Sequence, residues 1–317
     1  MYSQYINYSN FYIPEYVLDN HYFHEIGLTN EEIIAKSGIQ QRRRTSLKEN
    51  TNTMAIEAIK NSLDNLPYPL KEIDLIIGAT YTPYDTIYSV AHAVQQYFDI
   101  ANAKCFTVDA ACSSFINAVE VATCFFIAKK AKKALIVCSE NNSAYNNGKD
   151  KASGFLWGDG AAVAFISSER CSEQDIAIMD VNTTGLGNIG YSHESITLQP
   201  NNGGLKMPNG RDVFHHACTH LIAETKTILN RNNLAVSDMS YFIPHQANKR
   251  ITNYVAKQFG LANSRVLSNI EQLGNTGSAG SLIALAQNKT RFQPDDYIVV
   301  SVFGGGYSSG SLLLKKV

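Results

Sequence analysis

Cys112 is the residue whose setting first suggests covalent chemistry. Residues 103–108 before it form a short β-prone run, and the apolar residues after it recur at helical spacing. We therefore expect Cys112 to lie where a buried strand ends and a buried helix begins. A helix N-terminus presents free N–H groups and the positive end of the helix dipole, and both favour the nucleophilic thiolate. This setting predicts a catalytic nucleophile, although a buried inert cysteine would fit the same pattern.

The elements needed to position Cys112 occur twice along the chain. In the first half, strands are predicted at 73–79, 103–108, 134–138 and 161–166, with helices at 29–36, 53–63, 89–98 and 115–126. A strand at 240–243, a helix at 279–286 and a strand at 298–301 repeat part of this order, each about 165 residues after its counterpart. The repeat indicates two copies of one βα unit, and therefore an α/β fold in which parallel strands predominate. Two such units packed face to face would place equivalent strand ends around one cleft.

Three further features fall at those strand ends. His245 follows the predicted strand at 240–243 and precedes a predicted helix at 250–259. Asn275 lies in the turn before the helix that repeats the Cys112 helix, which places it near the symmetry mate of the cysteine. The glycines at 304–306 can bring backbone N–H groups close to a reacting atom, because glycine tolerates unusual dihedral angles. A nucleophile, a histidine, an amide and a glycine loop are therefore expected to converge in the cleft.

Composition narrows the possible functions. The chain has 317 residues, 17% of them charged, and a formal net charge of −1, which argues against nucleic-acid binding through bulk charge. No apolar run is long enough to cross a bilayer, and the first residues lack the pattern of a signal peptide, so a cytoplasmic protein is expected. The six cysteines include no Cys-x-x-Cys pair, as expected of reduced thiols in a reducing compartment.

Two weaker signals are discounted. Residues 185–190 match the glycine fingerprint of dinucleotide-binding folds, but no helix is predicted after them, so a loop is the better interpretation. His216 and His220 are four residues apart on a predicted helix, but no third metal ligand can be placed beside them. We therefore predict neither a cofactor nor a metal ion.

Five short segments resemble the β-ketoacyl-[acyl carrier protein] synthase III family, which has the thiolase fold. They are Ala-Ala-Cys-Ser-Ser-Phe at 110–115, Gly-Asp-Gly-Ala at 158–161, Pro-His-Gln-Ala-Asn-Lys-Arg at 244–250, Gly-Asn-Thr-Gly-Ser-Ala at 274–279 and Phe-Gly-Gly-Gly at 303–306. They keep the family's order and spacing, and the resemblance runs from about residue 29 to the C-terminus. It implies a homodimer of five-layer αβαβα subunits. Each subunit would have two thiolase-like halves, 1–170 with the cysteine and 171–317 with the histidine and asparagine.

The resemblance assigns a role to each motif. The catalytic residues would be Cys112, His245 and Asn275, and the N–H groups of Cys112 and Gly306 would form the oxyanion hole. An acyl thioester would acylate Cys112; a malonyl thioester would then lose carbon dioxide and attack the acyl group, giving a β-ketoacyl thioester. The remaining implied positions are Ile87, Phe303 and Gly305 in the substrate pocket and Lys249, Arg250 and Lys257 on a helix that docks acyl carrier protein.

The sequence departs from the family where coenzyme A binds. Glu32 stands at the position of a tryptophan that stacks on the adenine, and Lys36 and Lys151 replace arginines. The primer could be an acyl-coenzyme A or an acyl-carrier-protein thioester. Because glutamate cannot stack on adenine and repels phosphate, we expect coenzyme A thioesters to be the weaker of the two.

Three other hypotheses were weighed against condensation. An acyltransferase would pass the acyl group from Cys112 to an alcohol or amine without decarboxylation. A hydroxymethylglutaryl-type synthase would need a catalytic glutamate within 78–86, and that stretch has none. A silent partner subunit would not need Cys112, His245 and Asn275 together. We therefore expect condensation of an acyl primer with malonyl-[acyl carrier protein] in fatty-acid or secondary-metabolite biosynthesis, with acyl transfer as the alternative and no nucleic-acid or membrane partner.

Overall fold

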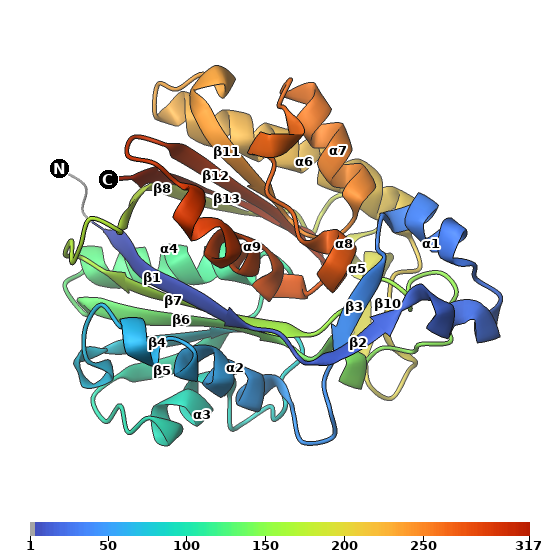
Figure 1. The fold of residues 1–317 in the computed structure, drawn as a ribbon, viewed down its shortest axis with the longest axis horizontal. Helices are drawn as coiled ribbons and strands as arrows, with labels where there is room; N and C mark the ends of the chain where they lie inside the picture. The colour runs from blue at the N-terminus through green and yellow to red at the C-terminus, as the bar shows by residue number, and fades with distance from the viewer. Residues whose placement is uncertain (1–3) are drawn as a thin grey trace.

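A nine-stranded mixed sheet runs through the centre of the molecule (Figure 1). The computed structural model describes residues 4–317. The strand order is β11-β12-β13-β8-β1-β7-β6-β4-β5. Along the chain these strands are β1 (Tyr5–Tyr12), β4 (Leu75–Ala79), β5 (Lys104–Val108), β6 (Lys133–Glu140), β7 (Gly160–Ser167), β8 (Ile176–Gly185), β11 (Met239–Pro244), β12 (Tyr297–Gly304) and β13 (Ser308–Lys316). Since β1 and β8 pair at only two positions, the sheet divides there into two halves.

Helices cover both halves of the sheet and fill the space between them (Figure 1). The buried pair between the halves is α4 (Ser114–Ile127) and α9 (Gly280–Asn288). The outer helices are α2 (Thr51–Lys60) and α3 (Val90–Tyr97) on one side and α6 (Gly210–Arg231) and α7 (Lys249–Gln258) on the other. The molecule is therefore the five-layer αβαβα sandwich of the thiolase fold, as predicted.

The sequence explains why α4 and α9 occupy the middle layer. Phe115 and Ile116 on α4 and Leu282 and Ile283 on α9 are fully buried. A helix that packs between two sheets must be apolar on both faces, whereas an outer helix needs only one apolar stripe. The strand and helix positions predicted from apolar spacing are all found, with ends that differ by a few residues.

The prediction that parallel strands predominate is wrong. Within the nine-stranded sheet, only β4–β5, β4–β6 and β11–β12 pair in parallel. The other five pairings are antiparallel. The reason is that each half ends in a strand, β7 or β13, that returns beside its predecessor, and β1 and β8 then extend the sheet in the same antiparallel manner.

Smaller elements lie beside the ends of the central strands. They are β2 (Tyr16–Asp19), α1 (Asn30–Ser37), β3 (Gln41–Arg44), α5 (Ser192–Ser195), β9 (Thr197–Gln199), β10 (Gly204–Lys206) and α8 (Ile270–Leu273). Helix α1 begins with a capping box between Thr29 and Glu32 and ends at Gly38, which has φ +78°, as predicted. Among residues 4–317, no helix has the length and apolar composition needed to cross a membrane.

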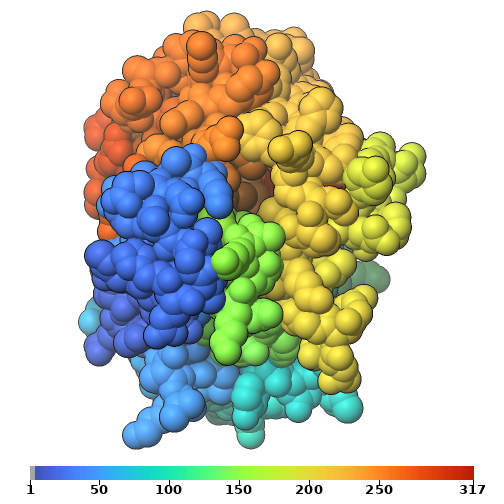
Figure 2. Space-filling view, turned by 90° about the vertical axis from the view of Figure 1, so that its right-hand side faces the viewer, coloured from blue at the N-terminus to red at the C-terminus, as the bar shows by residue number. Residues whose placement is uncertain are grey.

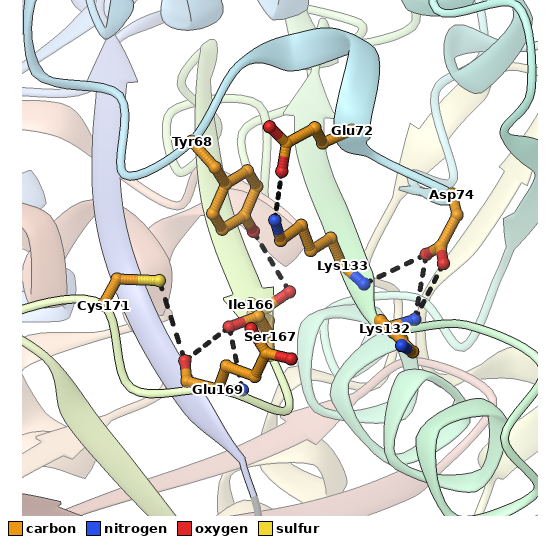
Figure 3. A network of polar contacts seen from close by, with 9 residues as sticks. All are labelled: Tyr68, Glu72, Asp74, Lys132, Lys133, Ile166, Ser167, Glu169 and Cys171. Carbon is orange, nitrogen blue, oxygen red and sulfur yellow. Dashed lines mark hydrogen bonds and ion pairs between the residues drawn. The ribbon is translucent and has the colours of Figure 1, made fainter.

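The end of the lysine-rich run at 129–133 is held against the segment before β4. Figure 3 shows the Asp74 carboxylate accepting hydrogen bonds from the backbone N–H groups of Lys132, at 2.9 Å, and Lys133, at 3.0 Å. The Lys133 ammonium forms an ion pair with Glu72 and lies 4.8 Å from the centre of the Tyr68 ring. These contacts fasten the start of β6 to the segment before β4, so the two neighbouring strands enter the sheet in register.

Candidate active site

Cys112 lies in the turn between β5 and α4, as predicted, with 4% of its surface exposed. The turn requires Ala111 in a left-handed conformation, with φ 49°. It is closed by a hydrogen bond from the Ser113 N–H to the Ala110 carbonyl at 3.1 Å and by one from the Ala110 N–H to the Ser114 hydroxyl at 2.8 Å. The turn therefore fixes the thiol at the N-terminus of α4, whose first turn is buried.

The glycine loop after β12 packs directly on this turn. A Cβ atom added to Gly304 would lie 2.7 Å from the Ala110 carbonyl oxygen, so only glycine allows this approach. The Gly305 N–H then donates a hydrogen bond to the Cys112 sulfur. The close packing of Gly304 thus brings the amide of the next residue onto the thiol. Gly306, whose N–H the sequence assigned to the oxyanion hole, follows in the same loop with φ +69° and also lines the cavity beside Cys112.

A cavity of about 490 Å³ opens beside Cys112. Its lining combines the cysteine turn, the glycine loop and a mainly apolar wall: Tyr81, Asp109, Ala110, Ala111, Cys112, Trp157, Ile196, Leu198, Leu205, Gly305, Gly306, Tyr307 and Ser308. Of the predicted pocket residues, only Gly305 lies in this lining. Ile87 is 90% exposed on the surface, and Phe303 is buried with its ring stacked on His220 at 5.9 Å. The reason is that the chain after β4 leads outward, and strand alternation turns Phe303 towards α6.

His245 follows the end of β11 and is almost completely buried. Its backbone N–H donates to the Ser301 carbonyl on β12 at 2.8 Å, which places it beside the strand that carries the glycine loop. Burial lowers the pKa of His245 to about 4, so the imidazole is neutral at physiological pH. Nδ1 is buried without a hydrogen-bond partner among the described residues. An unpaired lone pair is less costly than an unpaired N–H, which favours the tautomer with its proton on Nε2.

Asn275 is held by four hydrogen bonds. Its backbone N–H donates to the Leu156 carbonyl at 2.8 Å, and its own carbonyl accepts from the Gly158 N–H at 3.0 Å and from Asn142 Nδ2 at 3.2 Å. The side-chain Oδ1 accepts from the Gly277 N–H at 2.9 Å. Since a backbone N–H can only donate, this contact fixes the orientation of the amide and leaves Nδ2 as the group available to a substrate.

Burial is the largest influence on the pKa of Cys112. It raises the pKa of the thiol to about 12, and the nearby Glu140 carboxyl adds to the rise. The Tyr81 hydroxyl and the Gly305 N–H oppose the rise by hydrogen bonding to the sulfur. Desolvation of the charged form therefore disfavours a free Cys112 thiolate, and the two hydrogen bonds act in the opposite direction.

Glu140, at the end of β6, is a part of this site that sequence reasoning missed. Its carboxyl is fully buried and accepts hydrogen bonds from the hydroxyls of Ser278 at 2.5 Å, Thr82 at 2.5 Å and Thr80 at 3.0 Å. Burial raises its pKa to about 8. The available signal was an acidic residue ending an otherwise apolar strand run, Leu-Ile-Val-Cys-Ser-Glu at 135–140.

The predicted docking residues lie on α7, in three different settings. Lys249 forms an ion pair with Glu271 at 2.8 Å. The Arg250 guanidinium lies 5.7 Å from the centre of the Phe214 ring, and Lys257 is exposed. Arg250 and Lys257 are two turns apart and therefore face the same way, whereas Lys249 is occupied by its partner.

A second cavity, of about 610 Å³, lies where α1, the loop around 151 and the start of α6 meet. Lys36, Lys151 and Arg211 line it. Figure 2 shows a recess between these blue, green and yellow segments. Glu32 does not enter the lining: it is exposed, and its carboxylate accepts a hydrogen bond from the Thr29 N–H at 2.9 Å in the capping box of α1.

The structure also locates the two signals that the sequence analysis discounted, the glycine pattern at 185–190 and the pair of His216 and His220. Residues 185–190 form the end of β8 and a loop, and only the four-residue α5 follows, so the loop interpretation is confirmed. His216 and His220 lie on α6 with stacked rings 6.1 Å apart, and His216 Nε2 is 3.5 Å from Asp212. Residues 4–317 contain no group of three or more histidine, cysteine, aspartate or glutamate residues that could hold a metal ion.

The duplicated five-layer sandwich, with a cysteine at the start of its buried helix, defines a thiolase-fold condensing enzyme. Residues 106–187 match the family described as 3-oxoacyl-[acyl-carrier-protein (ACP)] synthase III, and residues 229–316 match its C-terminal family. The β-ketoacyl-[acyl-carrier-protein] synthase III of Clostridium perfringens is 35% identical over 96% of each chain. The corresponding protein of Aliarcobacter butzleri is 32% identical over 96% of this chain and 95% of its own.

A solved structure of a protein from the same family has the same fold. The crystal structure of 3-oxoacyl-[acyl-carrier-protein] synthase III from Aquifex aeolicus superposes with a TM-score of 0.91 at 30% identity, covering 98% of this chain and 99% of that one. The chain therefore belongs to the β-ketoacyl-[acyl carrier protein] synthase III family.

Proposed function

We propose that the protein condenses an acyl primer with malonyl-[acyl carrier protein]. The Cys112 sulfur attacks the primer thioester, a new C–S bond forms, and the departing thiolate takes up the proton that Cys112 loses. The malonyl thioester then loses carbon dioxide, and its enolate carbon attacks the acyl-cysteine. The Cys112 thiolate leaves and a β-ketoacyl thioester is released, as in fatty-acid or related biosynthesis.

The observation that carries this proposal is the neutrality of the groups assigned to the enolate. A pKa of about 4 keeps His245 uncharged, and the Gly277 N–H holds the Asn275 amide with Nδ2 free. The Nε2–H of His245 and the Nδ2–H of Asn275 can then donate to a developing enolate oxygen without having to be protonated first. The N–H groups of Cys112 and Gly306, which both line the cavity, are the matching pair for the tetrahedral oxyanion at the cysteine.

The alternative function is acyl transfer from Cys112 to an alcohol or amine. That reaction needs a base that accepts the proton of the acceptor, and a carboxylate hydrogen-bonded to the histidine would be the usual support. The described residues place no hydrogen-bond partner at His245 Nδ1, and burial makes the imidazole a weak base. This setting favours condensation.

Substitution of Asn275 tests the proposal. Asn275→Ala should leave acylation of Cys112 near normal, because that step uses the other oxyanion hole, and should lower decarboxylation and condensation by about 10² or more. Asn275→Asp should be as damaging, because an anion would face the enolate. The measurements are acyl-enzyme formation by intact-protein mass spectrometry and carbon dioxide release from malonyl-carrier protein. Acyl transfer to an added alcohol by wild type, with no carbon dioxide released, would replace condensation by the alternative function.

For the partner, we propose acyl carrier protein docked against Arg250 and Lys257 on α7. Both cations face outward on one side of the helix, which suits an acidic carrier surface. The cavity lined by Lys36, Lys151 and Arg211 is a suitable place for the phosphate of the carrier's arm or of coenzyme A. With Glu32 engaged in the capping box and no aromatic residue in its place, carrier-protein thioesters remain the better expected donors.

We also propose a boundary between the two halves at residue 170, a cytoplasmic location and a homodimer.

The surface that would form the homodimer lies at one edge of the sheet. Strand β5 forms this edge, and the exposed Tyr84, Ile87 and Tyr88 lie in the segment that follows its neighbour β4. An unpaired edge strand beside exposed apolar side chains is a suitable surface for a second copy of the chain.

A further inference from the structure

Tyr81 is a wall residue of the main cavity whose side chain reaches the reacting sulfur. Its ring lines the same cavity as Cys112, and its hydroxyl lies within hydrogen-bonding reach of Sγ. Strand β4 ends two residues earlier, at Ala79, whereas the Gly305 loop follows β12, which belongs to the other half of the sheet. The sulfur is therefore contacted by a backbone donor from one half of the molecule and a phenol from the other.

The hydroxyl of Tyr81 has a second partner, and that partner defines its role. It donates to Asn142 Oδ1 at 2.8 Å. The Asn142 amide cannot be reversed, because its Nδ2 donates to the Gly158 carbonyl at 2.7 Å and to the Asn275 carbonyl at 3.2 Å. While the phenol proton points at Asn142, the phenol oxygen offers a lone pair to the thiol S–H. When Cys112 becomes a thiolate, rotation of the hydroxyl turns the same proton onto the sulfur.

The packing around Tyr81 keeps it in this position. A Cβ atom added to Gly277 would lie 2.5 Å from the Tyr81 hydroxyl and 2.7 Å from its ring, so the ring occupies the space that a side chain at 277 would need. The Gly277 N–H also holds Asn275 Oδ1. Burial, together with the neighbouring Cys112 and Glu140, keeps the pKa of Tyr81 well above its usual range, so the phenol retains its proton.

We propose that the Tyr81 hydroxyl is a catalytic hydrogen-bond donor that stabilises the Cys112 thiolate, both when it attacks the primer and when it leaves the acyl-enzyme. In each half-reaction negative charge develops on Sγ inside a desolvated cavity, where an unpaired charge is costly. A hydrogen bond to a charged group in such a setting is worth about 1.5–3 kcal/mol, or roughly tenfold to a hundredfold in rate. The proposal rests on Cys112 as the nucleophile and extends the proposed function to a residue outside the His245–Asn275 pair.

The test measures alkylation of Cys112 by iodoacetamide between pH 6 and pH 10, followed by intact-protein mass spectrometry. Tyr81→Phe keeps the ring and removes the hydroxyl, and it should slow alkylation about tenfold or more at neutral pH and move the pH profile upward. Tyr68→Phe is the matched control. Tyr68 is also buried, but it does not line the Cys112 cavity, and its hydroxyl donates to the Ile166 carbonyl at 3.2 Å (Figure 3). The control should match wild type.

The other titratable groups near the thiol are unchanged in both variants, so they cannot cause a difference in profile. Those on the elements around Cys112 are Asp109, Glu140, His245 and Tyr307. Alkylation needs neither malonyl thioester nor decarboxylation, so its outcome is separate from that of the Asn275 experiment.

A second variant covers the case in which Tyr81→Phe does not fold. Replacement of Tyr81 by 3,5-difluorotyrosine keeps the shape and makes the phenol a stronger donor. Alkylation and primer acylation should then be faster than in wild type at the same pH. An unchanged pH profile in Tyr81→Phe, or slower alkylation in the fluorinated protein, would overturn the proposal.

Discussion

At the scale of single residues, this site holds its ionisable groups in their neutral forms. Burial raises the pKa of Cys112 to about 12 and that of Glu140 to about 8, and it lowers the pKa of His245 to about 4. Negative charge therefore develops in the site only during the reaction, on Sγ, on the tetrahedral oxygen and on the enolate. Donors that are already oriented, such as the Gly305 N–H and Asn275 Nδ2, stabilise such transient charge without reorganising.

The buried carboxyl of Glu140 predicts how stability depends on pH. Its folded pKa lies above its unfolded value of 4.5, so its contribution to stability is complete below pH 4.5 and is lost as the pH rises towards 8. Glu140→Gln cannot ionise, so its free energy of unfolding should decrease less than that of wild type between pH 5 and pH 8. The difference should reach several kcal/mol, on the order of 1.4 kcal/mol for each pKa unit.

Urea denaturation at pH 5 and pH 8, for wild type and Glu140→Gln, measures this difference. A control is Glu120→Gln, since Glu120 is a partly buried carboxylate on α4 that accepts from the Thr183 hydroxyl away from the Cys112 cavity. Equal pH dependence in wild type and Glu140→Gln would contradict the raised pKa.

At the scale of elements, the end of α1 is locked against the start of α7, two elements that lie far apart in the sequence. Asn248 Nδ2 donates to the Lys36 carbonyl at 3.1 Å, and the Asn248 Oδ1 caps α7 by accepting from the Arg250 N–H at 2.9 Å. Gly38 makes the approach possible, because a Cβ atom there would lie 2.3 Å from the Lys249 Cβ. Since α7 begins four residues after His245, this contact also supports the histidine loop.

Gly38→Ala should therefore lower the free energy of unfolding by roughly 2–5 kcal/mol, through a left-handed backbone at φ +78° and an overpacked contact with Lys249. Gly260→Ala is the matched control, because Gly260 also follows a helix, has φ +65° and has open space around its missing Cβ. It should lose only the backbone part, about 1–2 kcal/mol. The measurement is chemical denaturation. Equal losses in both variants would show that the Lys249 side chain can move away from a Cβ atom at position 38 without a measurable cost in stability.

At the scale of the whole molecule, electrostatic recognition must be local because the formal net charge is only −1. The cations of α7 lie close to those of the Lys36–Lys151–Arg211 cavity, because α7 packs against both α1 and α6. A partner that carries its own negative charge can be oriented by such a patch, while the rest of the surface remains close to neutral.

The double variant Arg250→Glu, Lys257→Glu should lower kcat/KM for an acyl-carrier-protein thioester by about tenfold and reduce its sensitivity to salt. Acylation of Cys112 by a small acyl-pantetheine should be unchanged, since it makes no contact with α7. Lys226→Glu, an exposed reversal on α6, serves as the control for net charge. A loss of the same size with acyl-pantetheine would show that the α7 variant damages the site itself.

The sequence by itself determined the layers of the fold and the chemistry of the site. Residues 103–126 change from strand to helical periodicity at Cys112, and the same order of elements returns about 165 residues later. Local periodicity and turn chemistry are properties of neighbouring residues, so they can be read along the chain. The same patterns placed Cys112, His245 and the glycine loop at strand ends, whereas Asn275 follows the short helix α8.

Only the tertiary structure decided which groups surround the site residues and how those groups shift their pKa values. Sequence neighbours gave no sign that Glu140 and Tyr81 would lie beside Cys112, or that the Gly305 N–H would contact its sulfur. The direction of the thiol's pKa shift was also decided by packing, because desolvation depends on every atom that surrounds a group and not on its helix alone. Strand direction was likewise decided by pairing between distant segments, which is why the antiparallel majority of the sheet could not be read from alternating strands and helices.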